Sequence, residues 1–488
     1  MIGITSFGGF VPRFRLNRQT IFQAMGWFNP ATFGSAAGER SVANSDEDSL
    51  TMAVAASVDC LRGRPRDGIR AVFVGSSSLP FELREAAGIV AAALDLSAEV
   101  RTADLTDSLR AGTAALLAGL DAVKAGPGGE VLVVASDCRL ARMGSMQEHM
   151  YGDAAAAVVL GDRDIIAEFK GSYSVSYDFG DHLRETGSRF DRTWEERWVR
   201  DEGYQKIIPQ AVAGLLKRCG LAIGDVAKVV FPCEFARAHS IIAKILGAKP
   251  EQVQDPLMKV LGDSGAAHPL VMLVAALQGA KPGDKIVLAG YGHGCDAMLF
   301  EVTDRITKVT QPRGIKGYLG IKEDIQSYER YAVFRELIPM EVGIRGEFQA
   351  PTAFSTLWRD RRAVMALVGT KCTSCGTPQF PPQRICVTCG AIDRMTDYRF
   401  SDKTGKVFTY TGDMLAFSVD PPAIYGIVDL DGGGRLYLDF TDCRIESIKV
   451  GMPVELSFRR KYHDRHRGIS GYFWKAVPLH SGVTGGTA

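Results

Sequence analysis

The chain has 488 residues, too many for a single hydrophobic core, so we expect two or three domains. Hydrophobic residues make up 46% and charged residues 23%, which is the composition of an ordinary globular protein. Lys and Arg number 57 against 56 Asp and Glu, and the net charge of +1 argues against nucleic acid or an anionic membrane as the main partner.

The opening sequence MIGITSFGGFVPRF lacks the basic region and long apolar run of a signal peptide. No stretch reaches the roughly 18 apolar residues that a bilayer-spanning helix needs. Four of the ten cysteines fall into a metal-ligand pattern, which favours a reducing compartment over a set of disulfides. We therefore expect a cytoplasmic protein that has no membrane segment.

Up to about residue 305, short apolar runs that end in small residues alternate with amphipathic helical patterns. The runs predict buried strands at 71–78, 131–138, 155–161, 228–235 and 285–292. The helical patterns cover 49–63, 111–126 and 269–283. This alternation predicts an α/β layered fold with a largely parallel core. Because the strand-and-turn pattern occurs in 70–165 and again in 225–305, we also expect two similar halves.

The second part of the chain has a different character. Residues 306–365 are mixed and charged and predict a linker with one or two helices. A zinc ribbon is expected at 366–398, and the evenly spaced short strands of 399–480 fit a small β-barrel, with the OB fold as one candidate. Residues 481–488 are expected to be a frayed tail.

The zinc prediction rests on a spacing of four cysteines. Cys372, Cys375, Cys386 and Cys389 form two C-x2-C pairs, and two such knuckles complete a tetrahedral shell around one ion. The glycines that follow Cys375 and Cys389 permit the positive φ that knuckles require. Since all four ligands come from the protein, no position is left for a substrate, and the zinc should be structural.

Five segments of the first 305 residues resemble the hydroxymethylglutaryl-CoA synthase branch of the thiolase superfamily, which is close to ketoacyl-acyl-carrier-protein synthase III. They are collinear with that branch and comprise 38–56, 103–116, 243–253, 261–277 and 289–302. Residues 366–480 resemble the zinc-ribbon-plus-OB family that accompanies thiolase-like enzymes of acyl-CoA. The resemblance implies a thiolase-type αβαβα domain over 1–305, followed by the zinc ribbon and an all-β OB barrel.

The resemblance also implies which positions should carry the synthase chemistry, and all of them are changed. The acyl-carrying Cys falls on Leu109, with Ser108 beside it. The His falls on Pro232, the Asn on Asp263 and the Glu on Ser77. The turn before the 111–126 helix therefore resembles the site of an acyl-enzyme without its cysteine.

Polar residues next to these positions are the remaining catalytic candidates. Ser108 is a possible nucleophile or a helix N-cap, and Cys233 is a reactive thiol or a small core residue. Glu234, at a strand end, is placed for general-base work or is a solvated loop acid. Asp263 is a proton acceptor or a helix cap.

The glycine turn YGHGCDA at 291–297 is a further candidate, because the matching turn in the synthases borders the active site. It holds Tyr291, His293, Cys295 and Asp296, and the ordinary pKa of a histidine side chain lies near neutrality. A structural histidine on a loop is the alternative. His239 and His268 are weaker candidates, since each is expected on a helix surface. Residues 189–206 are expected to be an ordinary solvated helix, with a cap on the pocket or a contact to the CoA phosphates as the alternative.

The resemblance implies an acyl-CoA thioester as substrate, a homodimer formed through the thiolase-like domain, and possibly a further pathway enzyme as partner. Arg237 loosely matches a lysine position that serves CoA binding in the synthases. Zinc is the expected cofactor.

Three functions are consistent with these candidate residues and with the resemblance. The first is a C–C lyase that cleaves a β-hydroxyacyl-CoA by retro-aldol chemistry, with Asp263, Glu234 or His293 as the base. Thiolase-like aldolases that work with a zinc-ribbon-OB partner also lack the acyl cysteine, which favours this function. The second is a Claisen-type acyltransferase that uses Cys233, Cys295 or Ser108. The third is a non-catalytic acyl-CoA-binding scaffold.

Overall fold

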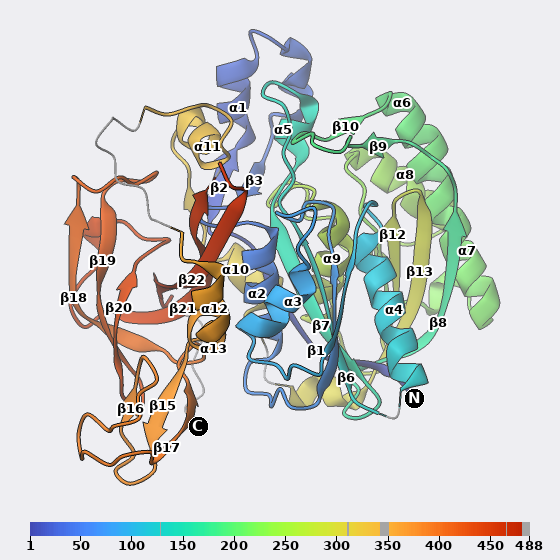
Figure 1. The fold of residues 1–488 in the computed structure, drawn as a ribbon. Helices are drawn as coiled ribbons and strands as arrows, with labels where there is room; N and C mark the ends of the chain where they lie inside the picture. The colour runs from blue at the N-terminus through green and yellow to red at the C-terminus, as the bar shows by residue number, and fades with distance from the viewer. Residues whose placement is uncertain (127, 310–311, 342–350, 465, 481–488) are drawn as a thin grey trace. The chain divides into compact units, whose positions relative to one another are not determined.

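The computed structural model describes residues 1–126, 128–309, 312–341, 351–464 and 466–480. The chain divides into two compact units (Figure 1). Unit 1 comprises Met1–Ala43, Asp48–Val90 and Ser97–Arg335. Unit 2 comprises Asn44–Glu47, Ala91–Leu96 and Glu336–Ala488.

Unit 1 is built on a nine-stranded sheet with the order β11-β12-β13-β8-β1-β7-β6-β4-β5. Its strands are β1 (Gly3–Phe10), β4 (Ile69–Gly75), β5 (Arg101–Leu105), β6 (Glu130–Asp137), β7 (Ala154–Gly161), β8 (Ala167–Ser176), β11 (Lys228–Val230), β12 (Lys285–Tyr291) and β13 (Gly294–Val302). Among these, β4 pairs in parallel with β5 and β6, and β11 pairs in parallel with β12. The other pairs are antiparallel.

The expectation of a largely parallel core is therefore wrong. A tight turn at residues 292–293 joins β12 directly to β13, and so short a connection can only produce an antiparallel pair. The strand predicted at 228–235 is also shorter than expected. It ends at Val230, and Pro232 has no N–H with which to continue the ladder.

The predicted duplication is confirmed by the pairing pattern. In the first half, β4 lies between β5 and β6 in parallel, and β7 and β1 follow antiparallel. In the second half, β11 lies between a parallel bridge at Val253 and β12, and β13 and β8 follow antiparallel. The fifth strand of the second half is thus reduced to a single bridge.

Helices pack on these halves in five layers. Helix α2 (Ser49–Cys60) packs on β1, β6 and β7, and α7 (Gln205–Cys219) packs on β8, β12 and β13. Between the halves, α4 (Ala111–Ala125) packs on α9 (His268–Leu277), and α9 contacts strands of both halves. Figure 1 shows α2 on one outer side of these strands and α7 on the other. This is the αβαβα arrangement that the sequence predicts.

The central layer is packed closely. An ideal Cβ on Gly112, near the start of α4, would lie 2.2 Å from the carbonyl oxygen of Ala266, just before α9. Helix α9 is buried along its whole length, as expected for a helix that is apolar all round. The starts of both central helices are therefore held next to each other.

Smaller elements complete unit 1. They are β2 (Phe14–Asn17), β3 (Glu39–Val42), β9 (His182–Leu183), β10 (Arg192–Thr193), β14 (Glu323–Asp324), α1 (Arg18–Met25), α5 (Met146–Met150), α6 (Glu196–Trp198), α8 (Ala236–Leu246), α10 (Gly314–Leu319) and α11 (Tyr328–Phe334). Helix α3 (Ala86–Ala93) begins in unit 1, and its last three residues belong to unit 2. The solvated helix expected at 189–206 is wrong: the segment contains β10, α6 and a π-helical turn, Val199–Tyr204, which ends in a buried tyrosine.

Unit 2 contains two small sheets and two short helices, α12 (Phe354–Arg359) and α13 (Arg361–Ala366). The first sheet is ordered β16 (Pro378–Gln379), β15 (Val368–Cys372), β17 (Met395–Arg399). The second is ordered β20 (Arg435–Asp439), β19 (Ala423–Leu430), β18 (Gly405–Asp413), β21 (Pro453–Asp464), β22 (Ile469–Pro478). A bridge from Phe440 to Ala476 brings the end of β20 to β22, which closes the barrel in part. Trp474 fills its interior and donates a hydrogen bond from Nε1 to the carbonyl of Met365 at 2.8 Å.

The predicted tail at 481–488 lies outside the described residues. Of the helices in the described part of the chain, none combines the length and the apolar character that crossing a bilayer requires.

Candidate functional site

Polar side chains collect in unit 1 at the carboxyl ends of strands, where ligands bind in open α/β sheets. Arg139 follows β6, Cys233 and Glu234 follow β11, and Tyr291 is the last residue of β12. Asp263 joins them from the loop before α9, through a backbone bridge to Tyr151. The duplicated topology thus brings the strand ends of both halves to one cluster.

Arg139 and Asp263 form a buried ion pair. Nη2 of Arg139 lies 2.5 Å from Oδ2 of Asp263 and also donates to the Asp263 carbonyl at 3.1 Å. The guanidinium lies 3.8 Å from the ring centroid of Tyr151. Burial by itself would raise the pKa of Asp263, but the charge of Arg139 outweighs burial and holds that pKa below its usual value. Both oxygens of the ionised Asp263 are already engaged, Oδ2 by Arg139 and Oδ1 by the N–H of Gly265 at 3.1 Å, which makes it a poor proton acceptor.

A second cluster surrounds His182. Its Nδ1 lies 3.2 Å from Oδ2 of Asp181, and its Nε2 lies 3.6 Å from Oε1 of Glu234. The Tyr291 hydroxyl donates to the same Asp181 oxygen at 2.5 Å. Burial would lower the pKa of His182, but the two carboxylates outweigh burial and raise it to about 10. His182 is thus an imidazolium at neutral pH, enclosed between two acids.

The thiols that an acyl-enzyme would need are poorly placed. Cys233 and Cys295 are both buried, and burial raises the pKa of each thiol well above its usual value. The Cys233 thiol lies 3.5 Å from the carbonyl oxygen of Phe235, to which it donates. Because the thiolate is the nucleophilic form, neither cysteine is activated in this structure.

Ser108 is bound to backbone groups at the start of α4. Its Oγ accepts the N–H of Arg110 at 3.1 Å and donates to the Gly292 carbonyl at 3.2 Å. Asp107, directly before it, has a φ of 70°, in the left-handed region. An ideal Cβ on Gly292 would lie 2.6 Å from the Arg110 nitrogen, so the 291–294 turn can approach this elbow only as glycine. Ser108 therefore supports the helix start, although Arg110 is the N-cap residue.

The other predicted residues lie apart from these clusters. His293 is half-buried in the 291–294 turn with a φ of 46°, and its carbonyl accepts the N–H of Tyr177 at 3.1 Å. Arg237 is exposed on α8. Ser77, at the position of the synthase Glu, donates from Oγ to the buried Asp137 at 2.8 Å.

Two histidines that were expected on helix surfaces are buried instead. The Nδ1 of His268 accepts the N–H of Ser264 at 3.1 Å, and its Nε2 lies 2.8 Å from the Pro256 carbonyl. His239 stacks on Phe231 with ring centroids 4.4 Å apart, and burial lowers its pKa to about 4. Both expectations are wrong because the helices that carry them, α9 and α8, bury these faces. Both rings are part of the core.

Sequence reasoning missed Arg139, Tyr151, Asp181 and His182. Arg139 follows the predicted strand 131–138 directly, so its position at a strand end could have identified it as a candidate. Asp181 precedes and His182 begins the two-residue strand β9, which is too short for periodicity or spacing to mark a residue. Tyr151 is marked only by the structure: its buried hydroxyl has no hydrogen-bond partner in the described part of the chain.

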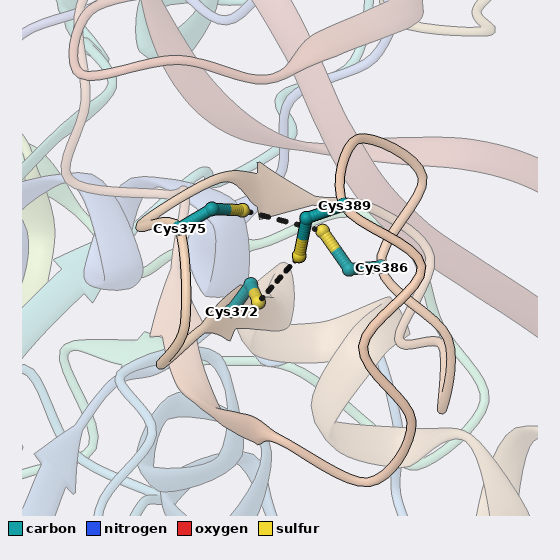
Figure 2. A group of neighbouring side chains, drawn as sticks. All are labelled: Cys372, Cys375, Cys386 and Cys389. Atoms are coloured by element: carbon teal, nitrogen blue, oxygen red, sulfur yellow. Dashed lines mark hydrogen bonds between the residues drawn. The ribbon is translucent and has the colours of Figure 1, made fainter.

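The four cysteines of unit 2 converge as their spacing predicts (Figure 2). Their sulfurs all lie within 4.8 Å of one another, with Cys375 and Cys386 3.5 Å apart and Cys372 and Cys389 3.7 Å apart. Tetrahedral zinc with Zn–S bonds of about 2.3 Å requires sulfurs about 3.8 Å apart, so the thiols fit the ion. Gly376 and Gly390 adopt positive φ values of 77° and 70°, as the two knuckles require.

Comparison with known proteins identifies the family of the first part of the chain. The chain is 30% identical to the hydroxymethylglutaryl-CoA synthase of Methanocaldococcus jannaschii over 348 residues, which covers 70% of this chain and 100% of that protein. It is 33% identical to the synthase of Aeropyrum pernix over 342 residues, which covers 68% of this chain and 94% of the relative.

The chain belongs to the hydroxymethylglutaryl-CoA synthase family.

Two further matches cover the C-terminal part of this hydroxymethylglutaryl-CoA synthase family member. Residues 359–392 match the rubredoxin-like zinc ribbon domain of ChsH2, and residues 398–459 match the C-terminal OB-fold domain of ChsH2. The predicted zinc ribbon and OB barrel are thereby confirmed. The four-cysteine site is the structural zinc site of such a ribbon.

Solved structures support the fold of the same family member. A crystal structure of HMG-CoA synthase complexed with CoA matches with a TM-score of 0.60 at 21% identity, covering 72% of this chain and 95% of that one. The 3-oxoacyl-(acyl carrier protein) synthase III of Pseudomonas aeruginosa matches with a TM-score of 0.55 at 20% identity, covering 62% and 98%. Both confirm the thiolase-like fold.

Proposed function

We propose that this chain acts on CoA thioesters and cleaves a β-hydroxyacyl-CoA by retro-aldol chemistry, without an acyl-enzyme. The observation that carries the proposal is the state of the possible nucleophiles. Leu109 stands at the turn before α4, Ser108 is bound to two backbone groups, and burial raises the pKa of Cys233 and Cys295. The CoA thioester as substrate rests on the family, whose named members are HMG-CoA synthases.

Glu234 is the base that the geometry favours. Asp263 is held by Arg139, whereas Glu234 is a buried carboxylate at a strand end, beside His182. Glu234 removes the proton of the substrate β-hydroxyl, and the Cα–Cβ bond breaks. The electron pair of that bond remains on the α-carbon as a thioester enolate. Return of the proton from Glu234 to this carbon gives a carbonyl compound and a shortened acyl-CoA, so atoms and electrons balance.

The test is turnover of a panel of 3-hydroxyacyl-CoA thioesters, followed by detection of both products. Glu234→Gln should lower kcat by about 10²–10⁴, the usual effect of losing one positioned base, and leave the affinity for CoA nearly unchanged. Ser108→Ala and Cys233→Ala are the matched controls and should retain most of the activity, because no acyl-enzyme forms.

The opposite pattern would support the acyltransferase instead. It consists of a stable mass increase on a cysteine or serine after incubation with acyl-CoA, together with a dispensable Glu234. Binding of CoA thioesters with no turnover of any panel member would support the scaffold.

A further inference from the structure

Asp181, His182 and Glu234 form a continuous line of buried groups that ends on the proposed base. The line begins at the Tyr291 hydroxyl, which donates to Asp181 at 2.5 Å. It passes through both ring nitrogens of His182, at 3.2 Å from Asp181 and 3.6 Å from Glu234. The side chains of the histidine and both acids are at most 8% exposed. Both contacts are ion pairs without hydrogen-bond geometry, so the charges of the two acids hold the protonated ring between them.

We infer that Asp181 and His182 are positioning residues for Glu234: Asp181 holds the imidazolium in place, and His182 sets a cation beside the Glu234 carboxylate and fixes its position. The inference rests on the proposed function, in which Glu234 is the base. When Glu234 takes the hydroxyl proton, His182 keeps both of its own protons, and the proton on Glu234 is the one returned to the α-carbon. His182 thus acts through Glu234 and not on the substrate.

The surroundings of Glu234 explain why such a partner is needed. Glu234 is faced by Tyr151, Tyr204 and Tyr291 and by the Cys233 thiol beside it in the chain. Burial raises the pKa of all four groups, so each is neutral at pH 7. Neutral groups offer a buried carboxylate no partner for its charge, whereas an adjacent cation does. The imidazolium of His182, whose pKa is raised to about 10, supplies this charge.

The first test compares His182→Gln with the wild-type enzyme. Glutamine keeps a hydrogen-bond donor but carries no charge, so we expect kcat to fall by on the order of 10²-fold, the effect of a misplaced reacting group, with KM nearly unchanged. His239→Gln is the matched control: that ring is buried too, but it stacks on Phe231.

The second test does not depend on turnover. The chain has eight histidines, and ¹⁵N-histidine labelling with His182→Gln for assignment isolates the signal of His182. Both ring nitrogens should stay protonated at pH 8 in the wild type, and Glu234→Gln should lower the pH at which one is lost. A neutral His182 at pH 8, or a kcat unchanged by His182→Gln, would overturn the inference. Inactive wild-type protein with a protonated His182 would instead overturn the proposed function.

Discussion

Arg139 is the cation on which a set of buried carboxylates in unit 1 depends. It is paired with Asp263 at 2.5 Å and with Asp191 at 3.8 Å, and its charge also acts on Asp137. Arg139→Met should therefore destabilise unit 1 by about 3–5 kcal/mol, because it leaves buried charges without a partner. The coupling energy between Arg139 and Asp263 is obtained from urea unfolding of this variant, of Asp263→Asn and of the double variant. The double variant should be more stable than Arg139→Met alone.

The pH dependence of this pair has a definite sign. The pKa of Asp263 is lowered in the folded state, so its contribution to stability is present above the ordinary aspartate value of about 3.9 and is lost as the pH falls through the lower folded value. When the pH is lowered below about 4, the free energy of unfolding of Asp263→Asn should fall less than that of the wild type. Equal losses in both proteins would show that the ion pair does not contribute.

At the level of single residues, part of the candidate site could be predicted from the sequence. Cys233, Glu234 and Tyr291 could be selected because they follow buried apolar runs, and the topology places strand ends together. His182 could not be selected, because the two-residue strand β9 that holds it is too short to show a pattern and its approach to Glu234 is a tertiary contact. His268 was misplaced although its helix, HPLVMLVAAL, is apolar all round, which indicates burial and not a surface.

Among the structural elements, the zinc ribbon yields the sharpest test. Cys372→Ser should release about one zinc ion per chain and destabilise unit 2, since apparent binding energies in small zinc modules reach roughly 10–16 kcal/mol. Metal content by mass spectrometry and thermal unfolding measure the two effects. Cys219→Ser, at the half-buried end of α7 in unit 1, is the control. A variant that keeps both its metal and its stability would contradict the structural role of the ion.

The elements themselves were largely predictable, but their pairing was not. Apolar runs such as 131–138 and 285–292 mark strands because a strand buried on both faces has no polar side. Such a run carries no signal of direction, since direction depends on the connection that follows. The long connections around β4 permit parallel pairing, whereas the glycine turn after Tyr291 forces an antiparallel pair.

For the whole molecule, we predict a homodimer formed through unit 1. The predicted thiolase-type pairing uses the sheet, and β5 is an edge strand with unpaired backbone groups. Light scattering at micromolar concentration should give twice the mass of the chain. Ala103→Lys, on the half-buried edge strand, should favour the monomer, whereas Arg101→Lys, at an exposed position, should not. A monomeric wild type would refute this prediction.

The place of β1 in the sheet has a consequence for biosynthesis. Residues 3–10 lie between β7 and β8, and the earlier of these in the chain, β7, ends at Gly161, so β1 has neither neighbour complete until about 150 further residues have been made. At about 5–20 residues per second, this takes roughly ten to thirty seconds. Throughout that time an apolar strand, GITSFGGF, is without its partners. Nascent chains of this protein should therefore depend on chaperones that shield such a strand, more than chains in which each strand pairs with the next one made.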